Sequence, residues 1–362
     1  MKIPAALRRV HLPTLLALTA FFGALLLRAW GLTWGLPSAA RYYPYHPDET
    51  VLLNAICGVN PLWGDVAPTF YNYGSLHILL SRLAYDVVSP FLGWGTVPRF
   101  DQPFPSWVGD FARLLLVGRW MTVLLGAATV PATYALGRRL FSARTGWLAA
   151  LFLAVAPLPV LLSHYLTVDV PAAFFTTLSL FFAAQALGSA EPKPALRWVA
   201  AAGFVAGLAI GTKYSSLPAL LALGVPLWHL SRAKGGRSRA IAAGALAVAL
   251  CAAGFLLATP GALLEPVKFS KDLAYEMGRN REGQGLLFKA TPPALLYHLG
   301  ISLPVGLEWP LYLLSMAGVA VALWRRRPAD WLLLVFLGLT FLMLAPAERK
   351  FLRYVTPLFP PL

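Results

Sequence analysis

The stretch LPTLLALTAFFGALLLRAWG, residues 12–31, is an apolar run long enough to cross a membrane. A bilayer-spanning helix needs about 20 mostly apolar residues, and similar runs recur along the whole chain. Of the 362 residues, 58% are hydrophobic and 12% are charged, whereas a soluble domain carries about 25% charged residues. The sequence therefore predicts an all-α, polytopic integral membrane protein rather than a large soluble domain.

We expect about nine or ten transmembrane helices in a single domain over residues 1–362. The further apolar runs lie at about 111–137, 146–165, 171–188, 197–212, 215–230, 240–259, 295–323 and 331–346, and a last one begins near residue 352. Because the sequence stops within this last run, it indicates a truncated C-terminus or an unusually short protein. A cleaved signal peptide is the alternative for the first run, but its length favours an uncleaved helix.

The formal net charge of +15 comes from basic residues that gather between the apolar runs. The positive-inside bias explains this pattern, so we do not expect nucleic acid as a partner. With the N-terminus inside, every cluster falls on the cytoplasmic side of the plasma (inner) membrane. The clusters are Lys2/Arg8/Arg9, Arg138/Arg139/Arg144, Arg232/Lys234/Arg237/Arg239 and Arg325/Arg326/Arg327.

Residues 32–110 are then the first extracytoplasmic loop, and their many Trp, Tyr, Pro and Gly residues are typical of a membrane–water interface. Within this loop, residues 49–57 and 75–92 favour helices, the second of which is predicted to lie along the interface. Residues 260–294 are predicted as another external loop. Gly203, Gly207 and Gly211, spaced by four, predict close packing of one helix against a neighbour.

Several ionisable side chains return to the outer face from segments far apart in the sequence. Such groups are costly near lipid and are usually functional. They are Asp48 and Glu49 in YYPYHPDETVLLNAI (42–56), Asp169 in HYLTVDVPAAFF, Lys213 in GTKYSSLP, and Arg349, Lys350 and Arg353 in ERKFLRYVTPLFPP.

Each of these residues also has a plainer explanation. Pro47, Asp48 and Glu49 make a good helix start, and Asp169 suits an N-cap. Lys213 and Arg353 could be interface anchors, and His46 and His164 ordinary interface residues. Their gathering on one face, where the positive-inside bias predicts few cations, favours a functional site.

A carboxylate at such a place can act as a general base, because partial desolvation brings its pKa nearer to working conditions. Cations at the lipid boundary suit an anionic head group, and Arg binds phosphate bidentately. A base together with a phosphate clamp is what group transfer from a lipid phosphate needs. The base activates an acceptor hydroxyl or amine, while the cations stabilise the leaving phosphate.

At these residues the chain resembles the C-type glycosyltransferases, in the branch of protein O-mannosyltransferases and of the aminoarabinose transferases of lipid A. The resemblance depends on an ordered set of segments that spans nearly the whole chain. They are HPDE after the first helix, NYGSLHILL (72–80), SHYLTVDVPAAFF (163–175), GLAIGTKYSSLPALL (207–221) and KFLRYVTPLFPPL (350–362). Members of this family usually continue for several more helices and often a soluble outer domain.

The resemblance implies an inverting transfer of sugar from a polyprenyl-phosphate-linked donor on the outer side of the membrane. Asp48 would be the base that activates the acceptor, Glu49 would support the acceptor or Asp48, and Asp169 would be a second acid of the cavity. The expected substrate-binding residues are His46, Lys213, Tyr214, Arg349, Lys350, Arg353 and Tyr354. The acceptor, whether protein, glycan or lipid, is not specified by the sequence.

Some members of the family bind a divalent metal through acidic and His ligands. His46, Glu49 and His164 are the candidates here, but no spacing identifies a metal site, and we expect no other cofactor. The alternative function is a transporter or flippase for a lipid-linked sugar, which would place charges near the bilayer midplane and often shows repeated halves. A membrane scaffold is a third hypothesis, against which the paired acids argue weakly.

Overall fold

The computed structural model describes residues 12–95, 97, 107–189, 192–233 and 235–362. Within these ranges the regular structure is helical, with two isolated β-bridges and no strand. This confirms the predicted all-α class. Lys2, Arg8, Arg9 and Lys234, which belong to the predicted basic clusters, lie outside the described residues.

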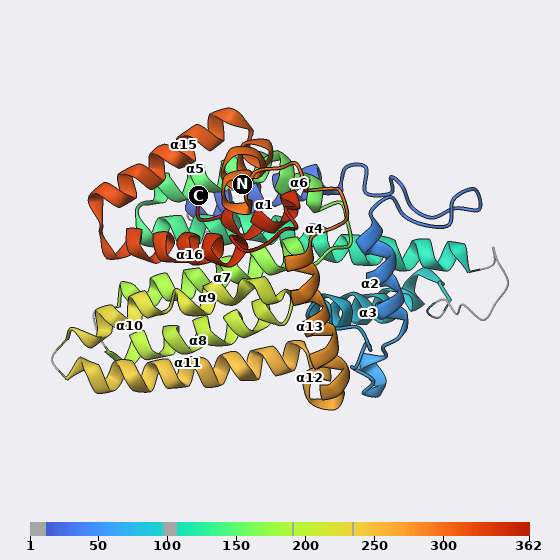
Figure 1. The fold of residues 1–362 in the computed structure, drawn as a ribbon, viewed down its shortest axis with the longest axis horizontal. Coiled ribbons are helices and arrows are strands. Elements are labelled where there is room, and N and C mark those ends of the chain that lie inside the picture. The colour runs from blue at the N-terminus through green and yellow to red at the C-terminus, as the bar shows by residue number, and fades with distance from the viewer. Residues whose placement is uncertain (1–11, 96, 98–106, 190–191, 234) are drawn as a thin grey trace, which may run out of the picture.

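Long helices run side by side along the longest axis of the molecule (Figure 1). The largest apolar core lies between them and contains buried residues of most of these helices. They are α1 (Leu12–Ala29), α4 (Val108–Leu140), α5 (Ala143–Val155), α7 (Asp169–Leu187), α8 (Pro192–Ile210), α11 (Gly236–Ala258), α15 (Leu303–Arg325) and α16 (Pro328–Leu344).

Four helical segments are long and apolar enough to cross a membrane: Val108–Leu140, Asp169–Leu187, Gly236–Ala258 and Ala294–Arg325. Shorter apolar helices accompany them at Leu15–Ala29, Ala143–Val155, Pro194–Ile210 and Pro328–Leu344. The chain is therefore an integral membrane protein by its helix lengths and composition. The number of nine or ten crossings stays a prediction.

Three predicted apolar runs are each divided into shorter helical elements. The run 146–165 divides into α5 and α6 (Pro157–Leu162), and 215–230 into α9 (Leu217–Leu221) and α10 (Gly224–Ser231). The run 295–323 begins with α14 (Ala294–Tyr297) and the π-helix η5 (His298–Ser302). It also kinks at Glu308, two residues before Pro310, where the missing proline N–H interrupts the helical hydrogen bonds.

The helix expected to begin near residue 352 is instead a short 3₁₀-helix, η6 (Leu352–Leu358). Pro357 lies within it, and a proline at that point cannot donate the backbone hydrogen bond that an α-helix requires. The segment is largely buried, and it packs beside α7. It therefore contributes to the core instead of continuing as an α-helix within the described sequence.

The three glycines of α8 make the close helix contact that their spacing predicts. A Cβ atom at Gly203 or Gly207 would collide with the carbonyl oxygen of Ala247 or Cys251 in α11. At Gly211 a Cβ would collide with the Ala258 side chain. The two backbones therefore approach more closely than any larger residue allows, which confirms the packing role.

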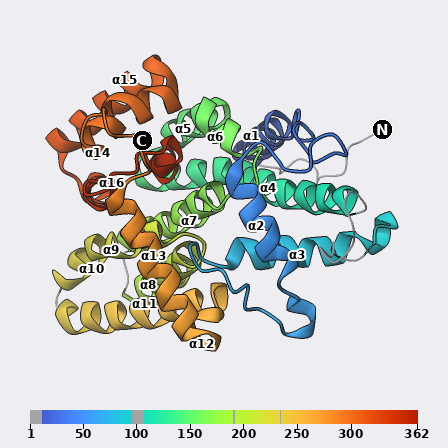
Figure 2. The same cartoon turned by 45° about the vertical axis from the view of Figure 1, so that its right-hand side comes forward.

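Residues 260–294, predicted as an external loop, contain regular helices. They contain α12 (Gly261–Leu264) and the polar helix α13 (Pro266–Glu282). A proline at the first position and the Lys268–Asp272 ion pair, 2.5 Å long, favour this helix. It ends at Gly283, whose φ of +83° suits glycine. In Figures 1 and 2, α13 lies between the α8–α11 bundle and α2.

The first loop contains the two helices that the sequence predicts, α2 (Pro47–Cys57) and α3 (Leu76–Val88). They pack with α4 around a second apolar core that includes Leu53, Ile78 and Leu114. The short 3₁₀-helices η2 (Pro61–Trp63), η3 (Pro90–Leu92) and η4 (Tyr214–Ser216) complete the described elements. The described residues of the loop therefore form a folded platform on one end of the bundle.

Basic residues gather at one end of the bundle. The turns α4–α5, α10–α11 and α15–α16 lie at the end away from α2, α3 and α13 (Figure 1). These turns and the helix ends that flank them hold Arg138, Arg139, Arg144, Arg232, Arg237, Arg239, Arg325, Arg326 and Arg327. We name this the basic end, and the opposite one the α13 end.

Candidate active site

Two acids and two cations from four separate segments meet at the α13 end. Arg353 Nη2 lies 3.1 Å from Asp48 Oδ2, and Arg353 Nε lies 3.9 Å from Asp169 Oδ2. Lys213 Nζ lies 2.5 Å from Asp169 Oδ1. Arg353 therefore bridges the two acids, and these four residues form what we name the acid–cation cluster.

Each member of the cluster lies at the start or end of a helix. Asp48 is in the first turn of α2, where its backbone N–H donates to Nδ1 of the N-cap residue His46 over 3.3 Å. Asp169 begins α7, and Lys213 lies between α8 and η4. Arg353 is in η6. The alternation of helices therefore returns all four residues to one end, as the sequence predicts.

The four side chains differ in their access to solvent. Asp169 is 2% exposed and faces both cations, whereas Asp48 is 19% exposed and has one ion pair, to Arg353. The Tyr73 hydroxyl donates to Asp48 over 3.4 Å, which is a long hydrogen bond. Asp48 is therefore the acid that an incoming acceptor can reach, while Asp169 holds the cations.

Aromatic rings line the cluster. Lys213 Nζ lies 4.9 Å from the centre of the Tyr354 ring, and the Arg353 guanidinium lies 4.2 Å from that of Phe351. Cation–π contacts of this kind help to fix the direction of a charged side chain. Burial raises the pKa of Tyr354 to about 12 and also raises that of Tyr73. Both phenols therefore remain protonated hydrogen-bond donors at neutral pH.

Tyr214, expected to line the donor site, forms hydrogen bonds with the backbone of the first loop. Its hydroxyl donates to the backbone oxygens of Tyr71, over 2.8 Å, and Tyr73, over 3.1 Å. The same segment is fixed by the Leu76 N–H, which donates to Gly211 O over 3.1 Å. Gly74 lies so near Gly211 that a Cβ atom would collide. Tyr214 therefore positions the segment that carries Tyr73.

Glu49, expected to support the acceptor or Asp48, makes its contacts within the protein. Its carboxylate accepts two hydrogen bonds from Arg119, of 2.7 and 2.8 Å, and one from the Leu166 N–H, of 2.8 Å. Glu49 is fully buried. Arg119 also donates to the backbone oxygens of Leu32 and Trp34. Glu49 therefore joins α2 to α4 and to two loops, so we assign it a positioning role rather than contact with an acceptor.

The sequence analysis did not single out Arg119, although a signal for it was present. It is one of two arginines within the apolar run 111–137 and the one nearer its middle, and buried charges are almost always paired. Only the folded chain shows that its partner is Glu49, 70 residues earlier.

Arg349 and Lys350, expected to bind substrate, are buried and contact the segment that follows α13. Arg349 Nε donates to Gly283 O over 3.2 Å, and Lys350 Nζ donates to Thr291 Oγ1 over 3.2 Å. Arg349 is also 3.8 Å from Glu276. These contacts attach the chain before η6 to residues 276–291 and so fix the position of Arg353.

One face of α13 contacts the segments around the cluster, and the sequence analysis did not predict these contacts. Asp272 accepts from the Tyr71 N–H over 2.9 Å, and Glu276 accepts from Asn72 over 3.4 Å. Asn280 accepts from the Tyr354 hydroxyl over 3.3 Å. The spacing of four between these residues is the helical signal in the sequence. This signal is easily missed, because the segment has a low hydropathy and an analysis based on apolar runs passes over it.

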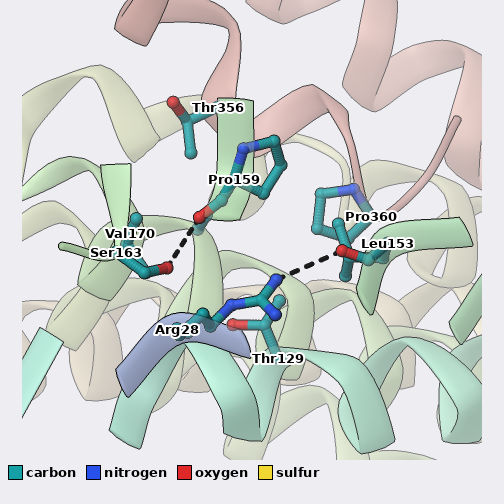
Figure 3. Close-up of a pocket in the computed structure, with 10 residues that line it drawn as sticks. Arg28, Thr129, Leu153, Pro159, Ser163, Val170, Thr356 and Pro360 are labelled. Atoms are coloured by element: carbon teal, nitrogen blue, oxygen red, sulfur yellow. Dashed lines mark hydrogen bonds between the residues drawn. The ribbon is translucent and has the colours of Figure 1, made fainter. Parts of the chain in front are cut away.

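A buried arginine supports the segment that leads to Asp169 (Figure 3). Pro157 has no N–H to bond the Leu153 oxygen, four residues earlier. Arg28 donates there instead, over 3.2 Å, and to Ala154 O over 3.0 Å. Ser163 and Val170 line the same small cavity. Arg28 therefore completes the hydrogen bonding that is broken between α5 and α6.

The candidate metal ligands do not fit a shared metal site. Glu49 is committed to Arg119 and Leu166, and both ring nitrogens of His164 face backbone oxygens, of Val160 and Trp30, at 2.9 Å. Nδ1 of His46 faces the Asp48 N–H. Among the described residues, no three His, Cys, Asp or Glu side chains gather as ligands.

Comparison with known proteins gives a family for part of the chain. Residues 100–266 match the family model of dolichyl-phosphate-mannose-protein mannosyltransferase. A sequence comparison with curated proteins found no match.

Solved structures have the same fold over most of the chain. ArnT from Cupriavidus metallidurans, bound to undecaprenyl phosphate, matches with a TM-score of 0.64 and 19% identity, over 99% of this chain and 59% of that one. The archaeal oligosaccharyltransferase AglB from Archaeoglobus fulgidus, in complex with an inhibitory peptide and a dolichol-phosphate, has a TM-score of 0.63 and 13% identity, covering 97% and 49%.

The Pmt1–Pmt2 protein O-mannosyltransferase complex of S. cerevisiae, bound to the sugar donor, gives a TM-score of 0.50 and 19% identity. The match covers 74% of this chain and 35% of that one. The chain thus spans between about a third and three fifths of the length of these three structures. These matches agree with the predicted resemblance: the fold is similar to that of these solved glycosyltransferases, and residues 100–266 match the family model of the protein mannosyltransferases.

Proposed function

We propose that the chain is the membrane part of an inverting glycosyltransferase that moves a sugar from a polyprenyl-phosphate-linked donor to an acceptor. The observation that carries the proposal is the bridge made by Arg353 between Asp48 and Asp169, with Lys213 beside it. This arrangement holds a reachable carboxylate next to two cations. Both elements of a transfer from a lipid phosphate are therefore present in one site.

The two cations of the cluster bind the donor phosphate. Arg353 presents several N–H donors to phosphate oxygens, and Lys213 adds a compact positive charge. Both stabilise the negative charge that grows on the phosphate as it leaves. Asp169, which is buried beneath both cations, keeps them in place while the phosphate arrives and departs.

Asp48 receives the proton of the acceptor. When Arg353 turns to the phosphate, the Asp48 carboxylate becomes free to accept a proton from the acceptor hydroxyl or amine. The acceptor oxygen or nitrogen forms a bond to the anomeric carbon, and the bond from that carbon to the phosphate oxygen breaks. The products are the glycosylated acceptor, with inverted configuration, and polyprenyl phosphate.

We place the cluster on the extracytoplasmic face of the plasma (inner) membrane. The support is the gathering of basic clusters at the turns of the basic end. The positive-inside bias assigns that end to the cytoplasm. The cations of the cluster lie at the other end, where ordinary anchoring residues are less expected.

The test is transfer by purified protein in lipid nanodiscs, supplied with labelled undecaprenyl-phosphate mannose and a membrane extract as the source of acceptors. We expect Asp48→Asn to lower the transfer rate by about 10²–10⁴-fold, the range for loss of a general base, with binding of undecaprenyl phosphate retained. Asp65→Asn is the matched control, because Asp65 is an exposed acid of the same loop.

Wild-type turnover in the Asp48→Asn protein would remove Asp48 from the role of base. Movement of the labelled lipid across the bilayer without any glycosylated product would instead favour a transporter. Other polyprenyl-phosphate sugars, including aminoarabinose, are supplied in parallel, since the sugar is not fixed by the four charged residues.

A further inference from the structure

A second site lies at the basic end, away from the acid–cation cluster. It is a cavity of about 520 Å³ between α10 and the turn that joins α15 to α16. The two sides are brought together by the contact between α10 and α16, which lie near each other at this end (Figure 1). A cavity of this size is within the range of small-molecule sites, about 300–1,000 Å³.

The rim of the cavity is positively charged. Arg232 comes from the end of α10 and Arg326 from the α15–α16 turn. His229 lies beside them, and none of the residues that line the cavity is acidic. In the described part of the chain, neither guanidinium has a carboxylate partner within ion-pair distance.

The nearest acid of the turn, Asp330, is already committed. It is buried, forms an ion pair with Arg325 and accepts a hydrogen bond from the Arg327 N–H over 2.9 Å. Arg326 has a left-handed backbone, with φ of 55°, and its Nε donates to Leu323 O over 2.8 Å. This contact fixes the Arg326 side chain at the cavity without neutralising its charge. The cavity is therefore built to attract an anion.

The walls of the cavity are apolar and aromatic. Val225 and Val335 line it from α10 and α16, and Trp228 and Trp331 stand at its sides with 67% and 43% of their surfaces exposed. The Arg232 guanidinium lies 6.0 Å from the centre of the Trp228 ring. Trp residues gather where a membrane meets water. An occupant therefore needs an anionic part at the arginines and an apolar part along the valines.

We propose that this cavity binds an anionic phospholipid, with its phosphate between Arg232 and Arg326 and an acyl chain along Val225 and Val335. Basic pockets between helices on the cytoplasmic side suit such head groups, and Arg contacts phosphate through two parallel hydrogen bonds. A free phosphate ion would use the arginines but leave the apolar wall without a partner. The site is independent of the proposed transfer reaction; only its assignment to the cytoplasmic leaflet depends on the same topology.

The test is native mass spectrometry of the purified protein with phosphatidylglycerol and, in parallel, phosphatidylcholine. We expect the wild type to retain phosphatidylglycerol preferentially and the double variant Arg232→Gln/Arg326→Gln to bind it at least 10-fold more weakly. The matched control is Arg237→Gln/Arg239→Gln, which removes the same charge from exposed positions of the same end outside the cavity. It should keep wild-type affinity. The single variants are used if the double variant does not fold.

A second readout locates the lipid. Phosphatidylglycerol with brominated acyl chains should quench tryptophan fluorescence less in Trp228→Phe/Trp331→Phe protein than in the wild type. Equal loss of binding in the test and control double variants would reduce the effect to general charge and overturn the proposal. So would equal retention of the two lipids, or complete displacement of phosphatidylglycerol by millimolar inorganic phosphate, which would indicate a free-anion site.

Discussion

Asp48 and Glu49 are neighbours in the sequence, yet they belong to opposite kinds of ionic centre. Glu49 is fully buried, and its carboxylate accepts three hydrogen bonds from Arg119 and Leu166. Asp48 is partly exposed and has one ion pair, shared through Arg353 with Asp169. A closed pair stabilises one arrangement of the chain, whereas an open and shared pair can exchange its partner for substrate.

The largest effect should come from opening the closed pair. Glu49→Gln leaves the Arg119 charge buried without a counter-charge, and breaking a buried pair from one side costs about 3–5 kcal/mol. Denaturant or thermal unfolding in detergent measures the loss of stability. Asp110→Asn is the control. The Asp110–Arg113 pair lies on α4, as Arg119 does, but it is exposed, so its loss should lower the stability by only about 0–1 kcal/mol.

A companion variant separates charge from packing. In Glu49→Gln/Arg119→Met the buried charge is removed together with its partner, so part of the lost stability should return. If Glu49→Gln is as stable as Asp110→Asn, the Glu49–Arg119 pair does not have the structural role that its burial indicates.

The next effect comes from the open centre. Arg353→Gln removes a cation from both Asp48 and Asp169, and charge-assisted hydrogen bonds contribute about 1.5–3 kcal/mol each. We expect the affinity for undecaprenyl phosphate to fall by about 10–100-fold, with a much smaller loss of stability than in Glu49→Gln. Arg281→Gln serves as the control, since Arg281 is an exposed cation near the end of α13.

Unchanged affinity for undecaprenyl phosphate in Arg353→Gln would mean that the phosphate binds elsewhere. The same assay on Lys213→Met asks whether the second cation acts with Arg353. A shared phosphate site predicts that both single changes weaken binding.

A smaller effect is expected from removing neutral hydrogen bonds that fix the backbone. Tyr214→Phe removes the donor to Tyr71 O and Tyr73 O, at a cost of about 1 kcal/mol for a hydrogen bond. Hydrogen exchange should increase over residues 71–76 before it changes elsewhere. Protection unchanged over this segment would show that Gly74 and Gly211 hold it without Tyr214.

The smallest effect concerns His46 and pH. Burial lowers the pKa of His46 below its usual 6.5, against the opposing charges of Asp48 and Glu49. The unfolded chain therefore binds a proton there that the folded protein does not, so stability falls as the pH drops below about 6.5. A protonated Nδ1 also cannot accept the Asp48 N–H.

His46→Asn keeps a capping side chain but does not titrate, so its thermal midpoint should fall less between pH 6.5 and 5. The comparison uses the difference between the two midpoint curves, because other groups titrate in both proteins. Parallel curves for the two proteins would exclude His46 as the source of the pH dependence.

Much of the fold could be predicted because apolar length and charge placement are local properties. The packing role of the α8 glycines follows from their spacing of four. The return of Asp48, Asp169, Lys213 and Arg353 to one end follows from the alternation of helices. The helix α13 could not be found by hydropathy, since its residues are polar and its stability depends on contacts with Tyr71 and Tyr354.

The distinction between Asp48 and Glu49 could not be predicted either. Adjacent residues at a helix start point in different directions, and a local pattern does not say which of them meets Arg119. Tyr214, Arg349 and Lys350 were predicted near the substrate, and here too the local pattern does not reveal their partners. Their types suit phosphate, but their partners, such as Gly283 and Thr291, come from distant segments.

The most direct test follows one turnover in Asp48→Asn and Glu49→Gln proteins that were first loaded with labelled undecaprenyl-phosphate mannose. The account predicts that folded Asp48→Asn protein holds the lipid without passing on its sugar. The fraction of Glu49→Gln that stays folded should deliver sugar at a rate within about tenfold of the wild type, as expected of a positioning residue. Rapid transfer of the sugar by Asp48→Asn protein would contradict the assignment of the two acids. So would a lack of sugar transfer in well-folded Glu49→Gln protein.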